Sequence, residues 1–476
     1  MPRDQDYPQN REDTRPEPPR GRERDSASAD PAREFFLNRP LGGLIVKNAL
    51  PAVASMLFIS LYQVVDGIMV GRRLGPEALA SVNILYPVVA VFIGLAVMIG
   101  VGGNARIAVL LGAGETKKAR RVLGLIAALG GGLGIAGSAA VAFILPDIIA
   151  LLGASGVLGE YAGQYLQALY PFAAPMILSF ILEQSVRNDG RPNLATAVMA
   201  FSALLNIFLD YYFLFVLNMG ISGAALATGI AQSLAAAFFL AYFLVKSAAR
   251  RPGLAFGLPG GGSGTLWIIL ANGFSEFFTE LAGGVATFLF NRSILHYVGP
   301  LGVAAYSLAQ YLMIFGIMIV VGMGTGTQPI LSYNHGAGLF LRVREALARL
   351  LAASLAVAGF FFLLLHWQAE PLAAFFIPEH PQALDLAVQV TKIMSWSLLL
   401  APAGIVGSIF FTSLEKVGSS LAVAVFRGLL CTVLGLAIFP PLWGQWGIWI
   451  TPVFSEGVTA LLVIFLVCRW HKEEGR

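Results

Sequence analysis

Two aspartates and an asparagine stand out because they lie inside otherwise apolar segments. Asp66 falls in the apolar run 41–70. Asp210 falls in the run 193–217, with Asn206 four residues before it and so on the same face of a helix. A carboxylate at mid-bilayer costs at least about 2.5–3.5 kcal/mol, which makes it a functional candidate by default. Two carboxyls and a carboxamide in one dry site can hold a proton, because burial disfavours the charged form. Alternatively, they can offer oxygen ligands to a small hard cation such as Na⁺.

Other charged side chains also fall within apolar segments, and several have structural explanations. The full set is Asp66, Arg106, Glu183, Asp210, Glu276, Glu280, Lys392, Arg427 and Glu456. Arg106 and Arg427 have long stems that can extend to the headgroups, and Glu456 is expected to pair with Arg427. Glu183 could join the two aspartates, whereas residues 187–192 are expected to form a structural turn.

The composition predicts a membrane scaffold for these residues. Of 476 residues, 57% are hydrophobic and only 12% are charged, against roughly 25% charged in soluble domains. Residues 1–38 hold much of the charge and are predicted to be a disordered cytoplasmic tail. Twelve later segments are long enough to cross a bilayer as helices. They lie near 41–70, 80–105, 122–145, 161–185, 193–217, 223–245, 264–292, 300–328, 346–368, 385–411, 418–441 and 447–469.

An internal repeat divides these segments into two sets of six. At an offset of 224 residues, Gly102 falls on Gly326 and Gly112 falls on Gly336. An even number of helices returns the chain to its starting side, so the repeats are parallel. The expected fold is therefore all-α, with twelve transmembrane helices in two parallel six-helix lobes. The predicted units are an N-terminal lobe 39–245, a cytoplasmic linker 246–263, a C-terminal lobe 264–470 and a cytoplasmic tail 471–476.

Basic residues in the short loops predict the orientation. Most of them lie in loops on one side, and the opposite loops hold only Arg72, Arg73 and Arg292. This excess places both termini in the cytoplasm of a multi-pass protein of the cell (inner) membrane. We expect a monomer with the lipid bilayer as its surroundings and no nucleic-acid partner.

Four stretches, taken in order with the repeat, resemble the multidrug and toxic compound extrusion (MATE) transporters. They are Leu61–Gly71, Leu110–Gly114, Arg187–Pro192 followed by Asn206–Asp210, and Gly444–Trp449 with Pro452 and Glu456. The resemblance covers roughly residues 40–470, and its bacterial subgroup of staphylococcal-type multidrug exporters is the most similar. It implies a MATE-like fold and export of drugs or organic cations, driven by inward H⁺ or Na⁺.

The resemblance also implies an ion-coupling site. The family's N-lobe site uses an Asp on helix 1, a polar residue on helix 4, an Asn and an Asp on helix 5 and a Thr on helix 6. The matching positions are Asp66, Glu183, Asn206, Asp210 and Thr228. Glu183 departs from the family, where Asn is commoner. In the C-lobe, Glu280 loosely matches the family's helix 7 Glu, but residues 386–411 contain no helix 10 Asp. Coupling in the N-lobe, with H⁺ preferred over Na⁺, is therefore expected.

Aromatic and Met side chains suggest a substrate cleft between the lobes. We expect Tyr62, Tyr86, Tyr306, Tyr311 and Met313 to line it. Such side chains suit flat organic cations and drugs, through cation–π contacts and the adaptability of Met.

Other classes of protein fit less well. The five His residues have no ligand spacing, and no phosphate-binding Gly-Lys-Ser/Thr loop occurs. We therefore expect no enzyme activity, no catalytic residues, no metal and no cofactor other than the coupling ion. Within the same superfamily, a flippase of a lipid-linked precursor or an exporter of a specific metabolite remains an alternative.

Overall fold

The chain folds almost entirely into helices. The computed structural model describes residues 30–376 and 381–474, and this part of the chain contains no strand. The α-helices are α1 Pro31–Asn38, α2 Leu41–Leu74, α3 Pro76–Ile84, α4 Tyr86–Gly112, α5 Thr116–Leu151, α6 Gly156–Leu169, α7 Ala173–Asn188, α8 Pro192–Tyr211, α9 Ile221–Ala248, α10 Gly262–Tyr297, α11 Pro300–Gly336, α12 Phe340–Trp367, α13 Ala369–Phe376, α14 Pro381–Ser413, α15 Val417–Val425, α16 Cys431–Trp443 and α17 Gln445–Glu474. Short π-helical turns at Tyr212–Val216 and Phe426–Leu430 continue α8 and α15.

Twelve helical units in the described ranges are long enough to cross a bilayer. Eleven also have the apolar composition of a membrane span, with α6–α7 and α15–α16 each counting as one unit. The twelfth, α10, has 36 residues and therefore spans roughly 54 Å at 1.5 Å per residue. It is more polar because Glu276 and Glu280 lie in its middle. The predicted class, an all-α protein with twelve membrane helices in two lobes, is confirmed.

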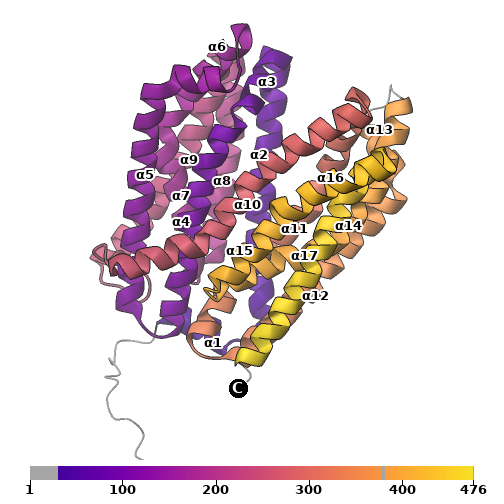
Figure 1. Cartoon of the computed structure of the whole chain (residues 1–476). Coiled ribbons are helices and arrows are strands. Elements are labelled where there is room, and N and C mark those ends of the chain that lie inside the picture. Colours follow the sequence, from indigo (N-terminus) through magenta and orange to yellow (C-terminus); the bar gives the residue numbers. More distant parts are fainter. Residues whose placement is uncertain (1–29, 377–380, 475–476) are drawn as a thin grey trace, which may run out of the picture.

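The helices form two bundles that follow the order of the sequence (Figure 1). Helices α4 to α9 lie together in one bundle, and α11 to α17 lie together in the other. Helix α10 runs diagonally across the molecule and packs against both α4 and α15, and α2 packs against both α8 and α11. The first and second halves therefore meet along α2–α11 and α4–α10. The lobe boundaries given above stay a prediction.

The two halves are related by the repeat found in the sequence. A Cβ on Gly112 would overlap the carbonyl oxygen of Tyr333, and a Cβ on Gly336 would overlap that of Val109. Adding the 224-residue offset to Gly112 and Val109 gives Gly336 and Tyr333. The two overlaps are thus one contact repeated by a pseudo-two-fold relation, whose axis passes between α4 and α11. Only glycine allows the helices this close approach.

Polar contacts join the halves at the end of the molecule that carries α1 and the C-terminus, which we call the α1 end (Figure 1). The Tyr333 hydroxyl of α11 donates to the carbonyl oxygen of Asn188 at the end of α7, at 2.7 Å. Arg106 of α4 forms an ion pair with Glu415, between α14 and α15, at 3.0 Å. The α1 end is therefore closed by direct contact between the halves.

The segment between α9 and α10 is bound to the first half. Arg120 of α5 donates to the carbonyl oxygen of Gly253 at 2.9 Å, and the amide of Leu254 donates to Asp189 at 3.2 Å. Leu254 is fully buried. Asp189 also accepts from Lys246, and burial raises the pKa of the Asp189 carboxyl although Lys246 opposes this. The predicted linker 246–263 is thus anchored to the first half at its centre, where residues 253–255 are buried, and is exposed on both sides of that point.

The predicted disordered tail is wrong for residues 30–38, which form helix α1 and its cap. Asp30 accepts from the amide of Ala32 at 3.0 Å, which caps the helix, and Pro31 occupies the first turn. Phe36 is completely buried, so the helix has an apolar anchor despite its charged neighbours. The rest of the predicted tail, residues 1–29, lies outside the described residues, as do 475–476. At the other terminus α17 continues to Glu474.

Candidate functional site

The carboxyls of Asp66 and Asp210 meet inside the first half. Asp66 comes from the C-terminal third of α2, and Asp210 lies next to the end of α8, just before a π-helical turn. The two side chains are within hydrogen-bonding reach of each other. Asp210 is fully buried, and each carboxyl has one buried oxygen without a partner. Two carboxyls this close cannot both be charged at low cost, so the pair has the chemistry to hold a proton or a cation.

Asn206 and Thr228 complete this cluster. Asn206 lies one turn before Asp210 on α8 and is buried. In the amide orientation that satisfies both neighbours, Asn206 donates to Asp210 Oδ2 at 3.3 Å and accepts from the Thr228 hydroxyl at 3.2 Å. Thr228 belongs to α9. Four of the predicted ion-site residues are therefore together in the structure, from three helices.

Three further residues belong to the same cluster and were not predicted for it. Tyr62, one turn before Asp66 on α2, lies beside Gln232 of α9 in the cavity wall. Gln232 in turn accepts from the Ser179 hydroxyl of α7 at 2.7 Å. Tyr165 of α6 is buried beside both aspartates. The sequence predicts Tyr62 for the cleft alone, whereas the structure places it between the acid cluster and the cavity.

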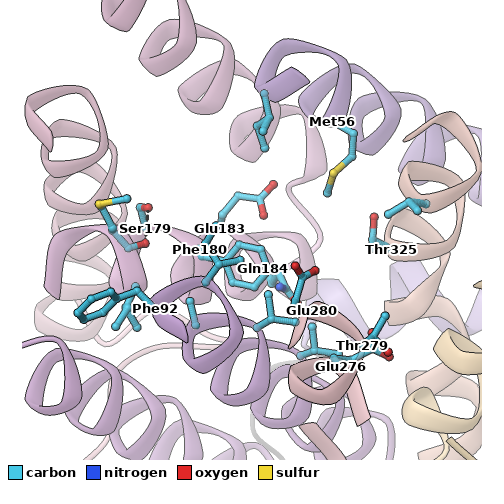
Figure 2. A pocket seen from close by; sticks show the side chains of 18 of the residues that line it. Met56, Phe92, Ser179, Phe180, Glu183, Gln184, Glu276, Thr279, Glu280 and Thr325 are labelled. Atoms are coloured by element: carbon cyan, nitrogen blue, oxygen red, sulfur yellow. Dashed lines mark hydrogen bonds between the residues drawn. The ribbon is translucent and has the colours of Figure 1, made fainter. Parts of the chain in front are cut away.

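A central cavity of about 590 Å³ lies between the two halves. Its walls include Tyr62 and Gln232, which border the acid cluster, whereas Asp66 and Asp210 themselves are not among the lining residues. Figure 2 shows Glu183 of α7 and Glu280 of α10 in one space, with Met56 and Thr325 on the far side. The volume is in the range of about 300–1,000 Å³ that holds a drug-sized molecule.

Glu183 lies in this cavity wall rather than in the acid cluster. Its Oε1 accepts from Nε of Arg187 at 2.9 Å and also from Nη2. Nη2 of Arg187 also donates to Ser55 at 3.0 Å. Both charged side chains are more than nine-tenths buried. Among the described contacts none joins Glu183 to Asp66 or Asp210, because its carboxylate is held by Arg187 one turn further along α7.

The acidic residues of α10 form the opposite part of the wall. Glu276 accepts from the Ser408 hydroxyl of α14 at 2.9 Å and from Thr412 at 3.4 Å. Glu280 lies one turn further, half-buried, near Tyr86 and Glu276. No side-chain hydrogen bond to Glu280 occurs among the described contacts. Glu280 is thus the cavity carboxylate best placed to face a positive charge.

Arg427 and Glu456 also pair in the second half, as the sequence predicted. Nε of Arg427 donates to both carboxylate oxygens of Glu456, at 2.9 and 3.2 Å. Arg427 lies in a π-helical turn and reaches the cavity wall. The two arginines of the cavity wall, Arg187 and Arg427, are therefore both neutralised by a glutamate.

Two of the five predicted cleft residues line the cavity, and three do not. Tyr62 and Tyr86 are in its wall. Tyr306 and Met313 are instead buried in the core of the second half, where Tyr306 stacks on Phe290 and Trp449 with ring centroids 5.4 and 6.3 Å away. Tyr311 is 59% exposed and lies outside the cavity wall. The prediction is wrong for these three residues.

Tyr306 and Met313 lie outside the cavity wall because α11 turns another of its faces to the cavity. Its lining residues Ile314, Met318, Val321, Thr325 and Gln328 follow the three- and four-residue spacing of one helical face. Tyr306 and Met313 lie on another face, which packs against the second-half core. Because α11 is apolar on most faces, the sequence pattern did not distinguish them.

This architecture defines a class of protein. Two like halves surround a cavity of drug size, and an acidic cluster inside one half is separated from that cavity by Tyr62 and Gln232 of its wall. A multi-pass membrane protein of this kind is a transporter rather than an enzyme.

Comparison with known proteins identifies the family. A sequence profile of the MatE family matches residues 51–212 and 277–436, with one match in each half. The multidrug export protein MepA of Staphylococcus aureus (strain MSSA476) is 26% identical over 447 residues, covering 91% of this chain and 95% of that protein. The chain therefore belongs to the MatE family, as the sequence motifs indicated.

Solved structures of MATE transporters have a similar fold. A structure described as the outward-facing conformation of a multidrug resistance MATE family transporter matches with a TM-score of 0.87 at 25% identity, covering 94% of this chain and 99% of that one. A MATE crystal structure in complex with MaL6 matches with a TM-score of 0.88 at 24% identity and the same coverage. These matches support the twelve-helix fold.

Proposed function

We propose that this protein is a secondary active antiporter, which exports organic cations or drugs in exchange for H⁺ by alternating access. The multidrug-exporting relative MepA supports drug efflux. We further propose that it works as a monomer in the cell (inner) membrane, with both termini in the cytoplasm. Its partners are small cationic molecules and the bilayer, and it uses no cofactor beyond the coupling ion.

The observation that carries the proposal is the buried Asp66–Asp210 pair and its connection to the cavity through Tyr62 and Gln232. The remaining side chains around the pair offer hydroxyl and amide groups rather than further carboxylates. A proton relieves the repulsion of two carboxyls without needing a complete set of oxygen ligands. This supports H⁺ over Na⁺ as the coupling ion.

Coupling follows from the position of the pair between helices. Asp66 belongs to α2, and α2 also packs against α11 of the second half. Gain of a proton converts a repelling pair into a carboxyl–carboxylate hydrogen bond, which changes how α2 and α8 pack. The proton biases the conformation only through its different affinity for the two states. Loading from outside and release to the cytoplasm would therefore drive the cycle.

The closed α1 end supports an outward-facing assignment. If both termini are cytoplasmic, then the contacts Tyr333–Asn188 and Arg106–Glu415 seal the cytoplasmic side. In this state protons reach the acid cluster from outside. Substrate would be held by Glu280 and by the aromatic and Met side chains of the cavity, through charge and cation–π contacts.

Transport into inside-out vesicles tests the ion site. A fluorescent organic cation is supplied with an imposed pH or Na⁺ gradient, and its uptake and its binding are measured separately. Asp66→Asn and Asp210→Asn should each lower pH-driven uptake at least tenfold while binding persists. Asp147→Asn is the matched control, because Asp147 is exposed on α5, and it should transport like the wild type. Glu280→Gln should weaken binding of the cation but retain coupling.

Three outcomes would change the proposal. If Glu280→Gln abolishes coupling and both aspartate variants still pump, the ion site lies in the second half. If uptake depends on Na⁺ and not on pH, the coupling ion is Na⁺ and the proposed ion-site residues are unchanged. If the wild type moves no organic cation under either gradient, the substrate is of another class, such as a lipid-linked precursor or a specific metabolite.

Labelling tests the orientation. In a variant whose Cys431 and Cys468 are replaced by serine, Arg250→Cys should resist a membrane-impermeant maleimide added to intact cells. Arg250 lies in the exposed turn after α9, so it should react rapidly once the membrane is permeabilised. Rapid labelling from outside would reverse the proposed topology.

A further inference from the structure

Helix α1 lies across the boundary between the two halves at the α1 end. On one side, Nε of Arg33 donates to the carbonyl oxygen of Gly112, the last residue of α4, at 3.1 Å. On the other side, the carbonyl oxygen of Phe36 accepts from Nδ2 of Asn334 on α11 at 3.3 Å. Arg342 of α12 also donates to the carbonyl oxygen of Arg39, which caps α1, at 2.9 Å. One eight-residue helix thus binds both halves.

Phe36 is the apolar anchor of this contact. Its side chain is 0% exposed, and its ring lies 4.6 Å from the ring of Tyr333 on α11. The neighbouring Phe35 is only partly buried, and its ring instead faces Arg39 and Lys47. Burial on α1 is therefore concentrated at the residue that touches α11.

Tyr333 connects α1 to the floor of the central cavity. Its hydroxyl donates to the carbonyl oxygen of Asn188, and the Asn188 amide donates to the carbonyl oxygen of Asn104 at 2.9 Å. Asn188 and Asn104 both line the cavity. From the cavity towards the α1 end, the order is therefore Asn188, then Tyr333, then Phe36. Tyr333 also belongs to the close α4–α11 contact, because its carbonyl oxygen lies against Gly112.

We propose that α1 is a latch that holds the α1 end of the transporter closed, and that its release from one half is a step of inward opening. This inference rests on the proposed alternating access. Opening the cavity at this end must separate Tyr333 from Asn188 and from Gly112. Helix α1 binds Gly112 in the first half and Tyr333 in the second, so it cannot keep both contacts once they separate. The contacts of Phe36 and Arg33 therefore stabilise only the closed state.

Distance measurements between spin labels test the latch without any substrate or ion gradient. In the full chain with Cys431 and Cys468 replaced by serine, labels are placed at Lys118 of α5 and Leu341 of α12. Both positions are exposed and lie in opposite halves near the α1 end. In lipid nanodiscs, Phe36→Ala should raise the ratio of long to short distances at least tenfold over the unmodified background. The matched control Phe35→Ala, on the same short helix, should change that ratio less than twofold.

Arg33→Ala provides a second variant, because it removes the hydrogen bond from α1 to the carbonyl oxygen of Gly112 and keeps the buried Phe36. It should shift the distances in the same direction as Phe36→Ala, by a smaller factor. The proposal is overturned if Phe36→Ala folds and gives the same distances as Phe35→Ala. If Phe36→Ala does not fold, an unchanged distribution in Arg33→Ala overturns it instead.

The two proposals fail separately. If wild-type vesicles show no gradient-driven cation uptake but Phe36→Ala lengthens the distances, the antiporter assignment is wrong and the latch stands. If the wild type exchanges cations for protons and the distances do not respond to Phe36→Ala, the latch alone is wrong.

Discussion

The buried Glu183–Arg187 pair allows a sharp test of whether Glu183 acts in coupling or in structure. Its two side chains are 8% and 5% exposed, and Arg187 has one further partner, Ser55. Glu183→Gln removes the negative charge but keeps the shape of the side chain. Arg187 is then left as a buried cation held by neutral groups.

The expected loss of stability is large. Removing one partner of a buried ion pair costs about 3–5 kcal/mol, because the other charge stays buried and uncompensated. For a chain of this size, about 2 °C of apparent Tm is expected per kcal/mol, so the Tm should fall by roughly 6–10 °C. The double variant Glu183→Gln, Arg187→Gln removes both charges and should recover most of this loss.

The assay is thermal unfolding in detergent together with vesicle uptake, for both single variants and the double variant. The matched control is Glu345→Gln, because Glu345 and Arg349 form an ion pair with the same four-residue spacing but are 51% and 47% exposed. An exposed pair of this type contributes only about 0.3–0.5 kcal/mol, so the control should shift the Tm by roughly 1 °C or less.

Two results would refute this reasoning. A Glu183→Gln variant as stable as the wild type would show that the pair does not hold the fold as its burial indicates. A double variant with recovered stability but no gradient-driven uptake would show that Glu183 has a role in coupling, as the family resemblance first suggested.

Gly112→Ala places a methyl group against a carbonyl of the second half and should destabilise by about 1–3 kcal/mol. Gly132→Ala, which has open space around its Cβ position, should be neutral or gain up to about 1 kcal/mol in the same Tm measurement. Tyr306→Ala should cost about 3–5 kcal/mol as a core truncation, whereas Tyr86→Ala should leave the Tm unchanged and weaken binding of an aromatic cation; equal effects on Tm would contradict their placement. Burial raises the pKa of Asp189 above its ordinary 3.8, so its contribution to stability is present below that value and is lost as the pH rises through the raised pKa. The Tm of the wild type relative to Asp189→Asn should therefore fall as the pH rises above 3.8. A rise would mean that its lysine partner outweighs burial.

The sequence alone determined the membrane class, the spans, the repeat and the core of the acidic cluster. A charge in an apolar helix is costly wherever its neighbours lie, so Asp66 and Asp210 could be recognised one residue at a time. Asn206 followed from helical spacing, and Thr228 from the family motif. Gln232, one turn after Thr228, could have been found by the same spacing. Tyr165 had no such signal, because no other residue of the cluster lies on α6.

Only the tertiary structure decided which faces and partners these residues have. Tyr306 and Met313 resembled cavity residues because α11 is apolar on most faces, and the packing of the neighbouring helices selects the face that meets the cavity. Glu183 could accept from Arg187 only because Arg187 continues α7 rather than starting a loop. Residues 30–38 looked disordered by composition, yet one buried ring, Phe36, orders them against a surface that α11 and α4 create together. The chemistry of a side chain is known from its residue type, whereas its burial depends on surfaces that form only when distant helices meet.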